Sequence, residues 1–326
     1  MRLTVDQAFT LREPGARDTA PPAPDGYTVT ATPYGTRVDG PDGGRLLYAC
    51  SEAPADPPAG GSPEGEPFPS QQVDVVIVDV VEAPEAIGAL RRAGVVGRTT
   101  VVVAVGGDHR VRSPAEFDRR ARLWGASAPS DGHELSCPPA AWPPDRVGGP
   151  HRVLITGGAR SGKSAEAELR LLAEPEVTYL ATGPQPGDDH AWAERVAAHR
   201  SRRPTWWKTQ ETLDAAAVLR DATGAVLFDC VGTWLAGVMD ACGLWSDDPP
   251  ADSLETLAAR EAELIDAWRQ CPALLVAVTN EVGSGVVPAT ASGNLFRDRL
   301  GRLNQLLAAE SEQVLLAAAG RIVDLP

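Results

Sequence analysis

Short apolar runs alternate with longer amphipathic segments through the second half of the chain. The runs have the length of β-strands, and they are HRVLITG (151–157), VTYLAT (177–182), AVLFDC (225–230), ALLVAVT (273–279) and QVLLAAAG (313–320). A strand buried on both faces reads as a continuous apolar run, and the segments between these runs are long enough for helices. The pattern therefore predicts an α/β fold, with a mostly parallel sheet and helices on both faces. RIVDL (321–325) can add a strand at the edge of this sheet.

A smaller α/β unit is predicted between residues 71 and 135. VDVVIVD (73–79) and TTVVVAV (99–105) read as buried strands, and a helical pattern follows each of them. Residues 1–70 contain twelve prolines and only short apolar stretches, so we expect a loop-rich region without a function of its own. Residues 136–150 are rich in Pro and Gly and read as a linker, which leaves 151–326 as the main domain.

GGARSGKS (157–164) carries the most specific chemistry in the sequence. The chain has 28 arginines and only two lysines, Lys163 and Lys208, so a lysine at this point indicates a need for an ammonium group. In the pattern G-x-x-x-x-G-K-S, backbone amides cradle phosphates, the lysine reaches the β- and γ-phosphates, and the serine, here Ser164, binds Mg²⁺. The alternative is a glycine-rich turn, but the apolar strand before the motif and the helical segment after it favour a phosphate-binding P-loop.

The residues that follow the other strands are further candidates, because ligands of such sheets bind beyond the carboxyl ends of the strands. They are Thr182, Gly183, Asp229, and Asn280 with Glu281. Asp229 ends the run AVLFD, which is the usual form of the acid that holds Mg²⁺ or its water in P-loop proteins. An ordinary acid at a strand end is the alternative, and the P-loop favours the metal role.

A basic stretch, ERVAAHRSRRPTWWKTQE (194–211), contains His199 and four arginines, Arg195, Arg200, Arg202 and Arg203. Spacing alone favours a packed core histidine, because His199 shares a helix face with apolar neighbours. A cluster of four arginines is typical of a site that binds polyphosphate. The alternative interpretation is a solvated basic patch that the C-terminal end of a helix favours.

Composition excludes several classes of partner. The formal net charge is −14, which argues against a broad nucleic-acid or anionic-membrane surface. No apolar segment follows a basic N-terminus and no run is long enough to span a membrane, so we expect a soluble cytoplasmic protein with a small-molecule partner. The five cysteines lack metal-type spacing and read as structural thiols. The sequence does not decide whether the chain forms a homo-oligomer.

The order of motifs from residue 151 to the C-terminus resembles a known enzyme family. TGGARSGKS, YLATG, ERVAAHRSRRPTWWKTQE, VLFDCVGTWL, VTNEVGSGVVP and FRDRLGRLNQLLAAESEQVLLAAAG follow one another as in the bifunctional adenosylcobinamide kinase / adenosylcobinamide-phosphate guanylyltransferases of cobalamin biosynthesis. The resemblance implies a RecA-like P-loop fold and two reactions. ATP or GTP phosphorylates the aminopropanol hydroxyl of adenosylcobinamide, and GMP is then transferred from GTP to that phosphate, giving adenosylcobinamide-GDP.

The resemblance also assigns roles to residues. His199 corresponds to the family's histidine that forms a covalent GMP intermediate, and Lys163 acts with it in catalysis. Ser164 and Asp229 are the implied Mg²⁺ ligands, and Asp229 replaces a Glu found in some members. The implied nucleotide-binding set is Gly157, Gly158, Ala159, Arg160, Ser161, Gly162, Lys163, Ser164, Ala181, Thr182, Gly183, Arg200, Ser201, Arg202, Arg203, Glu211 and Asp229. Asn280 and Glu281 are expected to have structural or cobinamide-side contacts.

The N-terminal half departs from the family, whose minimal plan begins at the P-loop strand. Residues 73–135 look like the end of a metallo-β-lactamase-type domain. His109 and His133 cannot build a dinuclear zinc site, so we expect a degenerate accessory unit without metal chemistry. Two alternatives for the whole chain are a RecA-like P-loop ATPase and a regulatory nucleotide-binding module, neither of which needs His199.

Overall fold

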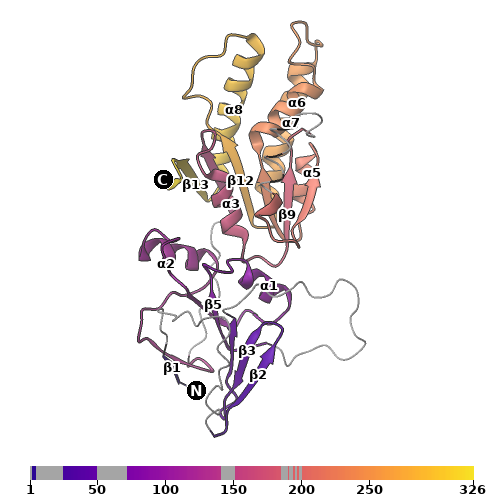
Figure 1. The fold of residues 1–326 in the computed structure, drawn as a ribbon. Helices are drawn as coiled ribbons and strands as arrows, with labels where there is room; N and C mark the ends of the chain where they lie inside the picture. Colours follow the sequence, from indigo (N-terminus) through magenta and orange to yellow (C-terminus); the bar gives the residue numbers. More distant parts are fainter. Residues whose placement is uncertain are drawn as a thin grey trace. The chain divides into compact units, whose positions relative to one another are not determined.

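The computed structural model describes residues 2–4, 25–49, 72–140, 151–184 and 200–326, together with His190, Glu194 and Ala197. The chain divides into two compact units, which Figure 1 colours from indigo to yellow along the sequence. The first comprises Met1–Val147 with Leu172–Pro175, and the second comprises Gly148–Leu171 with Glu176–Pro326.

The first unit contains a five-stranded sheet of order β2-β3-β4-β5-β6 in its described residues. Its strands are β2 (Thr28–Thr32), β3 (Gly35–Asp39), β4 (Arg45–Ala49), β5 (Val75–Asp79) and β6 (Val101–Val105). The pairs β2–β3 and β3–β4 are antiparallel, whereas β4–β5 and β5–β6 are parallel. Helices α1 (Ala86–Arg92) and α2 (Pro114–Leu123) follow β5 and β6, and β1 (Arg2–Thr4) pairs with β7 (Glu134–Ser136).

Residues 28–49 differ from the loop-rich segment that we expected there. They form β2, β3 and β4, so one sheet extends across the boundary predicted at residue 70. The sequence concealed these strands because two of them lack an apolar run. TVTAT is the exposed edge strand, GTRVD is mostly half-buried, and only RLLYA is substantially buried. Gly35, at φ 125°, closes the turn of the first hairpin, where an added Cβ would lie 2.2 Å from the Tyr48 carbonyl oxygen.

The second unit contains a seven-stranded sheet among its described residues, of order β10-β9-β11-β12-β8-β13-β14. The strands are β8 (Arg152–Gly157), β9 (Val177–Ala181), β10 (Lys208–Glu211), β11 (Ala225–Asp229), β12 (Leu275–Asn280), β13 (Gln313–Ala318) and β14 (Arg321–Leu325). Every neighbouring pair is parallel except β13–β14, which is antiparallel. The predicted α/β fold with a mostly parallel sheet is therefore confirmed, and RIVDL is an edge strand.

Strand register brings the expected site positions into line at one end of this sheet. Asp229 pairs with Ala181, and Asn280 pairs with Gly157. These four residues end β11, β9, β12 and β8, so their carboxyl ends share one edge.

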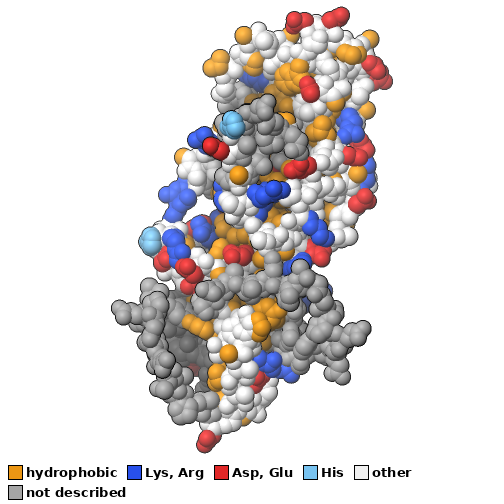
Figure 2. Space-filling model, turned by 45° about the vertical axis from the view of Figure 1, so that its right-hand side comes forward, with side chains coloured by type: hydrophobic (Ala, Val, Ile, Leu, Met, Phe, Trp, Pro, Cys, Tyr) orange, Lys and Arg blue, Asp and Glu red, His pale blue; other side chains and the backbone are white. Residues whose placement is uncertain are grey.

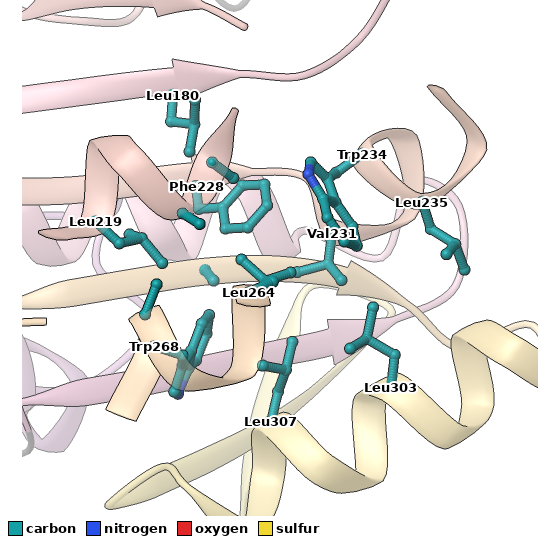
Figure 3. Close-up of a cluster of buried hydrophobic side chains, with 14 of the residues drawn as sticks. Leu180, Leu219, Phe228, Val231, Trp234, Leu235, Leu264, Trp268, Leu303 and Leu307 are labelled. Atoms are coloured by element: carbon teal, nitrogen blue, oxygen red, sulfur yellow. The ribbon is translucent and has the colours of Figure 1, made fainter. Parts of the chain in front are cut away.

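Helices bury the sheet through a large apolar cluster, part of which Figure 3 shows. The helices with described bounds in the second unit are α3 (Lys163–Leu171), α5 (Ala215–Arg220), α6 (Val231–Ala241), α7 (Ser253–Gln270) and α8 (Ala291–Ala309). Phe228 of β11 packs with Trp234 of α6 and Trp268 of α7, and each of these side chains is at most 1% exposed. Because side chains alternate along a strand, Asp229 points to the face opposite Phe228.

Candidate functional site

The P-loop connects β8 directly to α3, as the sequence predicted. Arg160 (φ 57°) and Gly162 (φ 100°) have left-handed backbone conformations, which turn the loop back on itself. Gly157 is required by close packing, since an added Cβ would lie 2.4 Å from the carbonyl oxygen of Ala317 in β13. The loop is also fixed by the amide of Gly320, which donates to the Ser161 carbonyl at 2.8 Å.

Lys163 is the first residue of α3, and its side chain returns over the loop. Its Nζ donates to the Gly158 carbonyl oxygen at 3.1 Å. The ammonium group therefore lies at the same place as the N-terminal amides of α3, where the helix dipole also favours an anion. Loop, lysine and helix together form an anion-binding site.

A pocket of about 430 Å³ opens beside this loop at the carboxyl edge of the sheet. Most of the expected residues line it: Ala159, Arg160, Ser161, Gly162, Lys163, Ser164, Ala181, Gly183, Arg200, Arg202, Arg203, Glu211 and Asp229. The walls also include Asn280, which ends β12 and whose carbonyl accepts from Asn304 Nδ2 at 3.1 Å. The volume is in the usual range for small-molecule sites.

Not every expected residue lines the pocket. Gly157 and Gly158 belong to the P-loop, but these two residues, Thr182 and Ser201 are not part of the pocket wall. The Glu281 side chain accepts from the Gly283 amide at 3.0 Å in the loop after β12. His199 and Arg195 lie outside the described residues.

The pocket also contains residues that sequence reasoning missed, chiefly Tyr179, Cys230 and Thr233. Tyr179 belongs to a buried strand and reads as a core residue, although strand alternation places it on the same face as Ala181. Its hydroxyl donates to Asp229 Oδ2 at 2.9 Å. The guanidinium carbon of Arg203 lies 3.7 Å from the centre of its ring.

Thr182 connects β9 to the start of α6. Its hydroxyl donates to the Cys230 carbonyl at 2.8 Å and lies 2.9 Å from the Thr233 hydroxyl, and the residue is 4% exposed. Cys230 caps α6 by accepting from the Thr233 amide. Burial, with a smaller effect of Asp229, raises the pKa of the Cys230 thiol, so the thiol remains protonated at neutral pH and is not a nucleophile.

Arg202 makes a two-point contact with the P-loop helix. Its Nε and Nη2 donate to the Glu168 carboxylate at 3.0 and 3.2 Å. Glu168 is 5% exposed, whereas the Arg202 side chain is 47% exposed and lines the pocket. This pair ties the basic stretch to α3.

The charge pattern around the pocket differs from that of the rest of the chain. Arg160, Lys163, Arg200, Arg202 and Arg203 all line it, against two carboxylates, Glu211 and Asp229. On the face that Figure 2 shows, basic and acidic side chains are otherwise interspersed. The pocket is therefore a local cationic site in an acidic chain, which suits a polyanionic small molecule.

No helix of the described chain is both long and apolar enough to cross a membrane. A solved structure of the P4 protein from bacteriophage phi6 in complex with ADP is similar to part of this chain. The match covers 55% of this chain and 56% of the P4 chain, at 17% sequence identity. Its TM-score of 0.28 is too low for the likeness to carry an argument.

Relatives match the second half of the chain closely. The bifunctional adenosylcobalamin biosynthesis protein CobU of Salmonella typhimurium is 40% identical over 177 residues, which are 52% of this chain and 96% of the relative. The CobU protein of Escherichia coli is 40% identical over 175 residues, and the CobP protein of Pseudomonas aeruginosa is 39% identical over 175 residues. The family model described as cobinamide kinase / cobinamide phosphate guanyltransferase matches residues 153–325. The chain therefore belongs to the cobinamide kinase / cobinamide phosphate guanyltransferase family.

Proposed function

We propose that this chain phosphorylates adenosylcobinamide with ATP or GTP and transfers GMP from GTP to adenosylcobinamide phosphate, giving adenosylcobinamide-GDP. The observation that carries the proposal is the cationic P-loop pocket, built entirely within the part of the chain that the family model matches. The same match favours this function over a RecA-like ATPase or a regulatory nucleotide-binding module.

In the kinase reaction, the P-loop amides and Lys163 hold the β- and γ-phosphates. The aminopropanol hydroxyl attacks the γ-phosphorus, its proton is lost, and the nucleoside diphosphate leaves. Catalysis of this step depends on positioning and on charge stabilisation, because charge spreads over the phosphoryl oxygens in the transition state. Lys163 supplies that positive charge at the loop.

Mg²⁺ fits this pocket. The Ser164 hydroxyl and the Asp229 carboxylate both line it, and they are the oxygen ligands that Mg²⁺ prefers beside nucleotide phosphates. When bound, the ion neutralises charge on the phosphates. The Asp229 carboxylate also accepts the hydrogen bond from the Tyr179 hydroxyl.

In the second reaction, His199 is the nucleophile assigned by family resemblance. Its imidazole attacks the α-phosphorus of GTP and pyrophosphate leaves; the phosphate of the substrate then attacks the phosphoramidate, GMP is transferred, and the imidazole is regenerated. The residues that follow it in sequence, Arg200, Arg202 and Arg203, line the pocket and offset the charge on the phosphates.

The two lysines of the chain provide a matched test. Lys163→Ala should reduce both kinase and guanylyl transfer rates by about a hundredfold or more, because the lost charge acts on the transition state. Lys208→Ala removes an exposed lysine on β10 that is not part of the pocket wall, and it should leave both rates unchanged. Product formation from adenosylcobinamide and GTP is followed by mass spectrometry. Near-normal turnover by Lys163→Ala in either reaction contradicts the proposal.

A further inference from the structure

Tyr179 contacts both kinds of group that the proposed function assigns to the nucleotide phosphates, a carboxylate that would hold Mg²⁺ and an arginine that would offset the phosphate charge. Its hydroxyl is 2.9 Å from Asp229 Oδ2, and its ring lies 3.7 Å below the guanidinium carbon of Arg203. The residue is 6% exposed, so both contacts are made by a side chain that packing holds in place.

The sheet itself brings Tyr179 and Asp229 together. Tyr179 pairs with Leu227 across β9 and β11, and Asp229 lies two residues further along β11. Residues in this diagonal relation share a face and are within reach of a long aromatic side chain. The contact is therefore fixed by strand register and does not depend on loop conformation.

The hydroxyl is the donor of this hydrogen bond. A phenol carries one O–H donor, and Asp229 Oδ2 is the acceptor that it meets at 2.9 Å.

Arg203 is restrained by a cation–π contact. Its guanidinium carbon lies over the Tyr179 ring, 3.7 Å from the ring centre, and the attraction between cation and ring favours this place for the group. Arg203 Nη1 also lies 3.5 Å from Thr209 Oγ1, and both residues line the pocket. Tyr179 therefore helps to hold this guanidinium at the phosphate site.

We propose that Tyr179 is a positioning residue that holds the Asp229 carboxylate and the Arg203 guanidinium in the arrangement that a magnesium–nucleotide complex requires. It acts through these two side chains and not on the reacting atoms. The inference rests on the proposed function for the identity of the nucleotide, but its test is a binding measurement that does not require turnover.

The test separates the hydroxyl from the ring. Tyr179→Phe removes the hydrogen bond to Asp229 and keeps the surface under Arg203, whereas Tyr179→Leu removes both. A fluorescent GTP analogue is titrated into the full chain with and without Mg²⁺. Tyr179→Phe should bind the metal-free nucleotide as the native chain does, and the tightening by Mg²⁺ should fall about fivefold, as expected for loss of one hydrogen bond.

Tyr179→Leu should lose the same magnesium effect and should also bind metal-free nucleotide about two- to fivefold more weakly, because Arg203 loses its cation–π partner. Tyr27→Phe, in the first unit, is the matched control and should change neither affinity. Thermal melts of all variants identify any loss through unfolding. A native magnesium effect in Tyr179→Phe overturns the inference, as does equal weakening of metal-free binding by both Tyr179 variants. Nucleotide binding without turnover by the native chain would refute the proposed function alone.

Discussion

The pair formed by Arg202 and Glu168 gives the sharpest prediction about stability. Glu168 is 5% exposed and accepts two hydrogen bonds from Arg202, whose side chain is 47% exposed. Removing one partner of a fully buried ion pair costs about 3–5 kcal/mol. Because water reaches the Arg202 side, we expect Arg202→Gln to lower the free energy of unfolding of the second unit by about 2 kcal/mol.

The pair itself is isolated by a double-mutant cycle with Arg202→Gln, Glu168→Gln and the double variant. We expect a coupling free energy of about 1–2 kcal/mol. It is measured by urea unfolding, and the transition of the second unit is identified as the one that moves to higher urea concentration when nucleotide is added. The control cycle uses Arg220 and Glu263, which make one contact at 3.2 Å with side chains 39% and 37% exposed. Exposed pairs of this kind contribute about 0.2–1 kcal/mol, so the coupling should be smaller in the control cycle. Equal coupling in the two cycles would refute the argument from burial.

Nucleotide affinities of Arg202→Gln and Glu168→Gln show whether Arg202 contacts the nucleotide directly or only holds the basic stretch in place. Glu168→Gln leaves the positive charge of Arg202 at the pocket, so nucleotide affinity should be kept, whereas Arg202→Gln should weaken it severalfold. Equal weakening by both variants would show that Arg202 serves the site only by tying the basic stretch to α3.

Two further predictions concern the rest of the chain. Hydrogen bonds from Arg119 and, to a smaller extent, Arg120 lower the pKa of Glu116 in α2 to about 2. The ionised carboxylate therefore stabilises the first unit at pH values above 4.5, the usual pKa of Glu. This stabilisation is lost as the pH falls from 4.5 toward 2. Glu116→Gln should therefore lower the free energy of unfolding by about 1–2 kcal/mol at pH 7 after allowance for solvent screening, and thermal melts should show the difference vanish near pH 2. A fragment that begins at residue 150 should fold and retain both activities, because relatives of about that length are matched over 96% of their sequence; an insoluble or inactive fragment contradicts the predicted boundary.

The sequence was sufficient for six of the seven strands described in the second unit and for most of the pocket wall. The seventh strand, β10, was not expected, because its four residues KTQE are polar and exposed. Parallel strands have their carboxyl ends at one edge, so the residues after each apolar run could be assigned to one site before any contact was known. ARSGKS (159–164) and Asp229 lie at or just after the ends of two of these runs, and both line the pocket.

The sequence pattern did not predict which individual side chains contact one another. Tyr179 was missed because an aromatic residue in an apolar run is typical of the core, and its second role depends on the register of β9 against β11. The contact of Arg202 with Glu168 was missed because Glu168 lies 34 positions away, in a helix with two acids. Thr182 was expected to bind nucleotide, but its hydroxyl is directed at the start of α6.

We infer that one site carries out both kinase and guanylyl transfer chemistry, with His199 as the covalent nucleophile. The most direct measurement uses GTP labelled at the α-phosphate. The full chain is incubated with it and denatured, and the stability of the covalent bond between label and protein is then measured in acid and in base. We predict a label that is retained in base, lost in acid as GMP, and absent from His199→Ala, while His199→Ala keeps its kinase activity and its melting temperature. No covalent label on the native chain, or an equal label on His199→Ala, would contradict the account.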